Sequence, residues 1–396
     1  MAEVIVMKFR KEYLFCITYF FTYVAQAISY CQLISFLSYL GYSATQRGFM
    51  FALGAIVGMV AEFYIGYLCD KNKTIKRYVF IIYPVYAVVV TVLYLINFNY
   101  FPLHLFVVGA NQLLFHANMG VIDSWVMESG EQCKESYGAI RAFGSLGWVV
   151  GSYIVSNIVS KIGYRYIGFF YSTIVVMICV VCHFIDDAVK IDKTKIQLSD
   201  VKLLFDNKKY VVLILILFCT FMMQNSLDYV IIDKLNILNA TAKQVGYYWM
   251  TIGLVELPLM FMGNRIAKKL GYSNMLLFAV AIYGIRFVLY GFSNSVTSVI
   301  LISLMQSMSF PIVQIASKHL IDHETPQQLK SSGQLIGLSL YSSTSALFAP
   351  LISGFLEDSF NINITMFVIS IFSIFAIIFV IVYKFLDRAN NVNLYK

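Results

Sequence analysis

A run of twelve apolar blocks, each about 20 residues long, constrains the fold of this 396-residue chain more than any other feature. A helix of about 20 apolar residues has the length needed to cross the roughly 30 Å hydrocarbon core of a bilayer. Charged residues make up only 13% of the chain, against roughly 25% in a soluble domain, and the mean hydropathy is +0.74. The sequence therefore predicts an all-α polytopic membrane protein with twelve transmembrane helices.

The twelve predicted spans alternate with polar loops. Because their number is even, both termini are expected on the same side of the membrane. The spans are Tyr13–Leu40, Thr45–Cys69, Tyr78–Ile96, Pro102–Met127, Tyr137–Val159, Tyr166–Phe184, Tyr210–Ile232, Val245–Ile266, Ser273–Phe292, Thr297–Leu320, Ser331–Phe355 and Ile362–Phe385.

The distribution of the 29 Lys and Arg residues predicts which side that is. Most of them lie in the two tails and in the loops that follow even-numbered spans. The positive-inside rule therefore places both termini in the cytoplasm of a multi-pass plasma-membrane protein. The formal net charge of +8 follows from this topology and requires no nucleic-acid partner. The few basic residues of the opposite loops are Arg47, Lys161, Arg165, Lys234 and Lys243.

The longest polar stretch divides the chain into two halves. It reads DDAVKIDKTKIQLSDVKLLFDNKKY, from Asp186 to Tyr210, and its mixed charges are typical of a solvated connector. We predict an N-terminal six-helix bundle at 1–185, a cytoplasmic linker at 186–209 and a C-terminal six-helix bundle at 210–396. Two such halves indicate a transporter with its site at the membrane midplane between them, although some membrane enzymes also have many spans.

Asp123 and Arg141 are ionisable residues inside predicted spans, where a charge costs roughly 2.5–3.5 kcal/mol. They lie at equal distances from Gln132, in the loop between the fourth and fifth spans. At about 1.5 Å per residue, the two arms of this helical hairpin bring them to the same depth, so we expect a charge-assisted contact. His116 and Trp148 share the helix faces of Asp123 and Arg141, which gathers four functional side chains in one region.

The second half repeats this arrangement. Glu256 in the eighth span and Arg286 in the ninth lie at equal distances from Gly271. Asp228 lies late in the seventh span and has no partner evident from sequence, and Glu62 belongs either to the lining of a site or to a helix contact. The alternative is that such buried ion pairs only fix helix packing, with a net stabilisation near zero.

Two further patterns have an ordinary structural explanation. CVVCH, at Cys179–His183, has the spacing of a redox or metal site. Its position in an apolar helix favours cysteines as small packing residues, and no metal or cofactor is predicted. The run SLYSSTSALFAP in the eleventh span is typical of close helix approach, with a binding role for its hydroxyl groups as the alternative.

The segment GYLCDKNKTIKRY, from Gly66 to Tyr78, resembles the signature between helices 2 and 3 of the major facilitator superfamily. The resemblance covers nearly the whole chain and implies a fold of two pseudo-symmetric six-helix bundles. It also implies that Gly66, Asp70 and Lys71 form a conformational-switch motif. This segment lacks the glycine that follows Asp-Lys in the family and contains one extra residue.

The segment RAFGSLGW, from Arg141 to Trp148, is similar to a motif of lactose-permease-like sugar–proton symporters, and Asp123 precedes its arginine by the eighteen positions found in that family. The resemblance implies that Asp123 and Arg141 bind sugar hydroxyls and that Trp148 stacks on the sugar ring. It places His116 at a further sugar-contacting position. Gly144 and Gly147 are expected to leave room for a ring beside the backbone.

The segment AVAIYGIRFVLYGF resembles helix 9 of the same family, with Arg286 at its functional arginine. The proton-site His and Glu of the family fall on Gln306 and Ser309, so both ionisable groups are missing. The acidic residue of helix 8 corresponds to Glu256, a pattern closer to phenylpropionate-permease-like relatives. The resemblance thus implies a proton-coupling site rebuilt around Glu256, Arg286 and Asp228, with Gln306 in contact with substrate.

These features predict a monomeric secondary transporter, not an enzyme, that moves a small sugar or glycoside together with protons by alternating access. A carrier for an aromatic acid, a nucleoside or another small organic solute is the alternative, because Arg141 or Arg286 can bind a carboxylate. ATP drive is not expected, since the chain contains no P-loop. A membrane sensor or enzyme would need an extramembrane domain or an interfacial catalytic cluster, and the loops offer neither.

Overall fold

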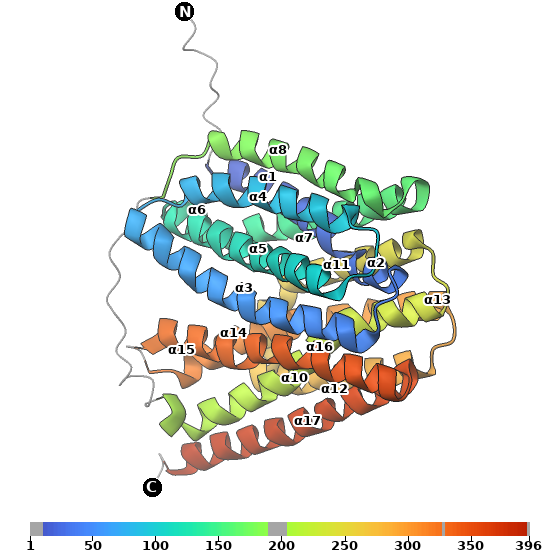
Figure 1. Cartoon of the computed structure of the whole chain (residues 1–396). Helices are drawn as coiled ribbons and strands as arrows, with labels where there is room; N and C mark the ends of the chain where they lie inside the picture. Colours follow the sequence, from blue (N-terminus) through green and yellow to red (C-terminus); the bar gives the residue numbers. More distant parts are fainter. Residues whose placement is uncertain (1–10, 189–203, 327–328, 394–396) are drawn as a thin grey trace, which may run out of the picture. The chain divides into compact units, whose positions relative to one another are not determined.

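The computed structural model describes residues 11–188, 204–326 and 329–393, and every regular element within these ranges is helical (Figure 1). Eleven candidate membrane spans occur among the described residues, each long and apolar enough to cross a bilayer. The eighth predicted span lies in α11 (Ala242–Leu270), a helix of 29 residues that is not among these eleven. The prediction of an all-α polytopic membrane protein is confirmed. Most of the predicted linker, 189–203, falls outside the described residues.

The first six predicted spans correspond closely to helices of the structure. They are α1 (Lys11–Tyr30) with α2 (Leu33–Tyr39), α3 (Ala44–Asn72), α4 (Lys76–Leu95), α5 (Phe101–Glu128), α7 (Tyr137–Ile162) and α8 (Ile167–His183), with the short α6 (Glu131–Glu135) and η1 (Tyr164–Tyr166) before α7 and α8.

The helices of the later spans include two that are interrupted. They are α10 (Lys208–Ile237), α11, α12 (Tyr272–Phe292), α13 (Val296–Ser303) with η2 (Leu304–Met308) and α14 (Phe310–Glu324), α15 (Lys330–Leu338) with the π-helical η4 (Ser339–Ser343) and α16 (Thr344–Ser359), and α17 (Ile362–Asn393).

Both interruptions have a local cause in the sequence. Pro311 lies at the start of α14, where its missing N–H and fixed φ are tolerated, so the tenth span bends through η2 rather than continuing as one α-helix. The π-helical turn of the eleventh span coincides with the hydroxyl-rich run SLYSS, and such turns often mark functional segments of helices.

The chain divides into two compact units that depart from the predicted halves at two helix ends. One unit comprises the described residues of Met1–Tyr42, Leu53–Asp192 and Ala240–Leu254. The other comprises those of Ser43–Ala52, Lys193–Asn239 and Val255–Lys396. The first turns of α3 therefore pack in the second unit, and the first turns of α11 pack in the first unit.

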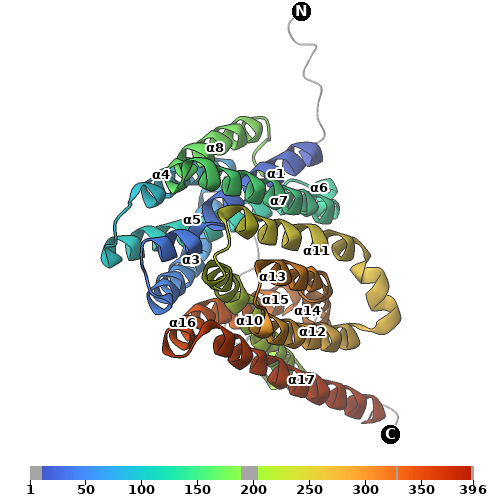
Figure 2. The same ribbon diagram turned by 90° about the vertical axis from the view of Figure 1, so that its right-hand side faces the viewer.

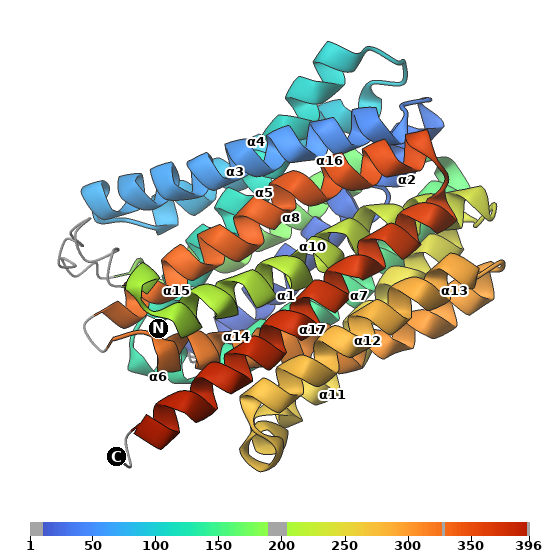
Figure 3. The same cartoon turned by 90° about the horizontal axis from the view of Figure 1, so that it is seen from below.

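Each unit is a bundle of helices in direct contact. In the first unit, α1 packs against α7 and α8, and α4 packs against α5 and α8 (Figure 2). In the second unit, α17 packs against α10 and α12, and α10 also packs against α16 (Figure 3). These contacts position the polar side chains of the buried helix faces.

Glycines of α7 allow its close approach to α1. A Cβ at Gly147 would overlap the backbone carbonyl of Phe20, and a Cβ at Gly144 would lie 2.8 Å from the ring of Tyr23. The expectation that these glycines leave room for a ring is met by a side chain of the protein, because Tyr23 of α1 fills the space beside Gly144. Small residues in membrane helices commonly serve this purpose.

A second glycine-mediated contact joins α3 to α5. A Cβ at Gly58 of α3 would lie 2.7 Å from the imidazole of His116, and a Cβ at Gly120 of α5 would lie 3.0 Å from Cγ of Glu62. Because 58 and 62 are one helical turn apart, as are 116 and 120, the two helices align in register. This register places Glu62 and His116 in the same contact as the turn that carries Asp123.

The start of α4 is fixed by a carboxylate that follows α8. Asp187 accepts hydrogen bonds from the backbone N–H groups of Ile75 and Lys76, each at 2.9 Å. Burial acts to raise the pKa of Asp187, but the hydrogen bonds from Lys76, Thr74 and Ile75 outweigh it and lower this pKa. Asp187 thereby caps α4 as an acceptor supplied from a distant part of the chain.

Candidate functional site

The first polar cluster lies where α5 and α7 face α1, all in the first unit. The hydroxyl of Tyr19 donates a hydrogen bond to Oδ1 of Asp123. Tyr137, at the start of α7, lies within hydrogen-bonding reach of the same carboxylate. The guanidinium of Arg141 lies over the ring of Tyr23, 4.5 Å from its centroid. Because 19 and 23 are one turn apart, Asp123 and Arg141 reach neighbouring turns of α1.

The predicted direct contact between Asp123 and Arg141 is not formed. Among the described residues, no carboxylate oxygen lies within 4.0 Å of a guanidinium nitrogen of Arg141. Two tyrosines of α1 contact the charges instead. The hydroxyl of Tyr19 bonds to the carboxylate, and the ring face of Tyr23 contacts the guanidinium in a cation–π arrangement. The buried hydroxyl of Tyr23 has no hydrogen-bond partner among the described residues. The cluster therefore retains unused donors beside a carboxylate.

Trp148 belongs to an aromatic group within the first unit. Its ring centroid lies 6.2 Å from that of Tyr30 on α1 and 5.8 Å from that of Trp249 on α11. Phe115 of α5 packs against Tyr30 at 5.8 Å. The indole N–H of Trp249 donates to the backbone carbonyl of Cys31 at 3.1 Å, which fixes this ring. The half-buried Trp148 therefore has flat apolar neighbours on several sides.

The second polar cluster is buried in the second unit and centres on Arg286. One nitrogen, Nη1, donates to Oε1 of Gln306 at 2.6 Å and to Oγ of Ser309 at 2.8 Å. Nε2 of Gln306 donates in turn to Oε1 of Glu256 at 2.7 Å. Since arginine only donates and an ionised carboxylate only accepts, these partners fix the orientation of the amide. Gln306 thus links the arginine and the carboxylate that were predicted to meet.

Asp228 joins this cluster through two further side chains. Nε2 of Gln224 donates to Oδ1 of Asp228 at 3.2 Å, and the hydroxyl of Tyr283 donates to Oε1 of Gln224 at 2.7 Å. Tyr283 in turn lies beside Arg286, whose guanidinium carbon is 5.7 Å from its ring centroid. The three residues predicted for proton coupling, Asp228, Glu256 and Arg286, therefore lie in one polar neighbourhood, in which the ring of Tyr283 joins two hydrogen-bonded groups.

The predicted switch motif lies at the end of α3. A Cβ at Gly66 would meet no atom of the described residues within 4 Å, so among them no helix approaches closely at this glycine. Asp70 and Lys71 are exposed, and Nζ of Lys71 lies 6.0 Å from the ring centroid of Tyr67. The role of these three residues stays a prediction.

Sequence reasoning missed the tyrosines and one glutamine of the two clusters. Tyr19, Tyr23 and Tyr30 lie along one face of α1, and that spacing is a usable signal, because polar tips repeated at helical period on an apolar span point to a buried polar surface. Gln224 and Tyr283 carried no comparable signal, since single neutral polar residues are common in spans.

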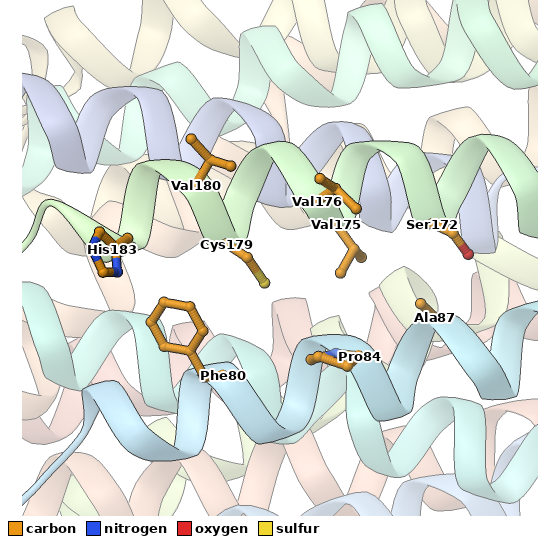
Figure 4. Close-up of a pocket in the computed structure, with 9 residues that line it drawn as sticks. All are labelled: Phe80, Pro84, Ala87, Ser172, Val175, Val176, Cys179, Val180 and His183. Carbon is orange, nitrogen blue, oxygen red and sulfur yellow. The ribbon is translucent and has the colours of Figure 1, made fainter.

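The CVVCH segment of α8 packs against α4 and α1. Figure 4 shows Cys179 and His183 of α8 facing Phe80 and Pro84 of α4 across a groove of about 510 Å³. The groove is lined mainly by hydrocarbon, and Cys182 points elsewhere, into contact with Thr18 at 4.0 Å. In the described ranges, no group of three or more His, Cys, Asp or Glu side chains is arranged to hold a metal ion.

Comparison with known proteins identifies the kind of molecule that carries these clusters. The sequence matches the family described as "MFS_1 like family" over residues 13–369. A curated relative, the "Uncharacterized transporter YwbF" of Bacillus subtilis (strain 168), is 20% identical over 341 residues, which are 84% of this chain and 83% of that protein.

Solved transporter structures share the fold. A mutant of the nucleoside transporter NupG superimposes with a TM-score of 0.82 at 12% identity, covering 94% of this chain and 99% of that one. A bacterial homologue of the human lysosomal transporter Spinster gives a TM-score of 0.74 at 9% identity, with coverages of 94% and 96%. At such identities the similarity establishes the fold alone.

Proposed function

This chain belongs to the MFS_1 like family, and we propose that it is a secondary transporter that moves a small sugar or glycoside into the cell together with protons. The observation that carries the substrate class is the state of Arg141. Its charge lies in the helical bundle, and its nearest described partner is the ring face of Tyr23 rather than a carboxylate. Its planar set of N–H donors is therefore available to a ligand.

The neighbouring groups favour a ligand rich in hydroxyls. A sugar hydroxyl both donates and accepts, so it can donate to Asp123 while accepting from Arg141. The unpartnered hydroxyl of Tyr23 offers a further contact of the same kind. Trp148 supplies a flat face of the sort that stacks on the apolar side of a sugar ring. A purely apolar ligand would leave the donors of Arg141 and the hydroxyl of Tyr23 without hydrogen-bond partners.

A nucleoside is the second candidate, and the aromatic group favours it. Tyr30, Phe115, Trp148 and Trp249 place four rings close together, which suits a planar base better than a second sugar ring. The ribose of a nucleoside would present hydroxyls to Asp123 and Arg141 in the same way as a sugar. The fold shared with the nucleoside transporter NupG is compatible with this candidate.

We infer that the second cluster supplies the coupling to protons. Asp228 and Glu256 are two carboxyl groups with one arginine, Arg286, in their shared network. One bound proton makes the three groups neutral, and a neutral cluster is cheaper to move through a low-dielectric environment. Neither Gln306 nor Ser309 can titrate, so the proton is carried by a carboxylate.

Competition in proteoliposomes tests the substrate class. We expect unlabelled glycosides to inhibit the uptake of a mixture of labelled sugars at lower concentrations than nucleosides or aromatic acids do. Arg141→Lys should raise the inhibitory concentration of the glycosides at least tenfold, because lysine lacks the planar set of N–H donors of the guanidinium. Lys134→Arg is a matched control on the exposed surface. Preferential transport of nucleosides would select the second candidate. Transport of an aromatic acid alone would contradict both, since it would assign Arg141 to a carboxylate.

A further inference from the structure

A buried ion pair outside both polar clusters joins the first turn of α3 to the last turn of α10. Nη2 of Arg47 lies 2.7 Å from Oδ1 of Asp233, and the two side chains are only 8% and 7% exposed. The carboxyl group of Glu357, in the last turn of α16, lies within hydrogen-bonding reach of Asp233. All three helix ends belong to the second unit.

The chemistry of this contact requires a proton. Two ionised carboxylates only accept hydrogen bonds, so Asp233 and Glu357 can bond to each other only when one of them is protonated. Arg47 balances the charge of the other. With one proton bound the three groups are neutral together, and without it a second negative charge lies beside the buried pair, which is unfavourable.

The surrounding contact is tight and includes few other charges. Asp358 accepts from the backbone N–H groups of the first two residues of α3 at 3.1 and 2.8 Å, and it is exposed. A Cβ at Gly48 would overlap the carbonyl of Pro350 on α16. Lys234, next to Asp233, donates instead to Asn363 of α17.

The corresponding contact of α11 is made by neutral groups. In the first unit, Nε2 of Gln32 donates to the backbone carbonyl of Ala242 at 3.1 Å, and Trp249 donates to the carbonyl of Cys31. A Cβ at Gly246 would overlap the hydroxyl of Ser156 on α7. The contact at the start of α3 therefore contains ionisable side chains, whereas the contact at the start of α11 does not.

We propose that Arg47, Asp233 and Glu357 form a proton-dependent gate on the non-cytoplasmic side of the protein. The charge distribution of the chain places these three helix ends on that side. Arg47 belongs to the first six spans, and its two partners belong to the last six, so an alternating-access cycle makes and breaks this contact. On closing, one proton passes from the outside solution to the carboxyl pair; on opening, the same proton returns.

An acidic exterior therefore favours the closed gate, and an alkaline exterior favours the open one. Among the described residues, Asp358 is a further charged group beside the pair, and its negative charge adds to the repulsion when the proton is lost. The gate acts without substrate and involves none of the residues of the two polar clusters. Its test is thus separate from that of the substrate and of the coupling site.

Thiol accessibility measures the gate directly. Ala44, in the first turn of α3, is 7% exposed, so a cysteine at this position reacts with a membrane-impermeant maleimide only when the contact opens. Tyr39→Cys is the reference, since Tyr39 is 68% exposed and reports the intrinsic pH dependence of thiol reactivity. Peptide mass spectrometry identifies the labelled site without replacing the native cysteines. The protein is assayed in right-side-out vesicles.

After normalisation to the reference, we expect Ala44→Cys to react about threefold or more faster at about pH 8 than at about pH 5.5, because the open population grows as the proton is lost. Adding Glu357→Gln, a permanent mimic of the protonated acid, should make labelling slow at both pH values. Asp233→Asn, which removes the partner of Arg47, should make it fast at both.

Asp358→Asn is the matched control, because it changes the neighbouring carboxylate on the same helix turn. It should keep a pH dependence with a smaller ratio of rates, because the negative charge that adds to the repulsion is lost while the proton site remains. An unchanged ratio of rates in Glu357→Gln, or the absence of any ratio in the wild-type background, would overturn the proposal. Purified Glu357→Gln protein with a normal elution profile and melting temperature excludes misfolding as the cause of slow labelling.

Discussion

At the scale of single residues, the charges of Arg141 and Arg286 are compensated in different ways. Arg141 rests on the ring of Tyr23, and Asp123 is satisfied separately by Tyr19. Arg286 donates to Gln306 and Ser309. A membrane-buried charge is stable only with such compensation. Because Arg286 is held by fixed protein acceptors and Arg141 is not, we propose that Arg141 binds substrate and that Arg286 belongs to the coupling site.

Trp148 provides a prediction at this scale. Stacking needs an aromatic face more than an indole nitrogen, and it contributes about 0.5–1.5 kcal/mol beyond area burial. Trp148→Tyr should therefore keep most of the substrate affinity, whereas Trp148→Ala should lose it several-fold. Equilibrium binding of the transported substrate to purified protein checks both variants.

The control for this prediction is the folded state of the same variants, since Trp148 also packs against Tyr30 and Trp249. Melting temperatures separate a loss of packing from a loss of binding. Equal affinity in Trp148→Ala and wild type would assign the ring to packing alone and would remove the aromatic platform from the proposed site.

At the scale of helices, close approach at glycines sets the geometry of the first cluster. Gly147 brings the backbone of α7 against that of α1 and so brings Arg141 within reach of Tyr23. Gly147→Ala should destabilise the protein by about 1–3 kcal/mol, because the added methyl group meets backbone rather than a movable side chain. Thermal unfolding in detergent measures this.

Gly109→Ala is the matched control, because a Cβ at this position of α5 would meet no atom within 4 Å. It should be neutral or slightly stabilising, as alanine favours the helix by about 1 kcal/mol. If the two substitutions change the melting temperature equally, the contact between α1 and α7 does not depend on Gly147.

The sequence predicted the helices well and their partners less well. Apolar length and regular helical rise are local properties, so they indicated the spans and the equal depth of Asp123 and Arg141. Tyr19 and Tyr23 lie between Asp123 and Arg141 because α1 is the helix that packs against α7. Gln306 bridges Glu256 and Arg286 because the tenth span is interrupted. Such contacts are tertiary and leave no periodic pattern.

The same limit applies to Arg47. From the sequence, the charge of Arg47 contributes only to the prediction of the topology. Nothing in the neighbouring sequence indicates that Asp233 lies beside this arginine. The predicted boundary of the two halves likewise follows the polar stretch, whereas contacts assign the first turns of α3 and α11 to the other unit. Amino-acid composition does not indicate which helix ends pack outside their own bundle.

At the scale of the whole molecule, separate clusters suit separate tasks. We propose that the first cluster, around Arg141, binds the solute, that the second, around Arg286, binds the driving proton, and that the Arg47 contact responds to the outside pH. A fold of this family can combine these tasks because its helices are rigid and the changes occur at their contacts. Glu256 is central to this division, since it accepts directly from Gln306.

The most direct measurement is substrate-induced proton uptake into proteoliposomes, followed as alkalinisation of a weakly buffered outside solution. Wild-type protein should take up protons when substrate is added. Glu256→Gln should take up none, yet should still exchange labelled for unlabelled substrate, because the first cluster is intact and the amide imitates the protonated acid. Proton uptake by Glu256→Gln at the wild-type rate, or substrate accumulation by wild-type protein without any proton uptake, would contradict the account.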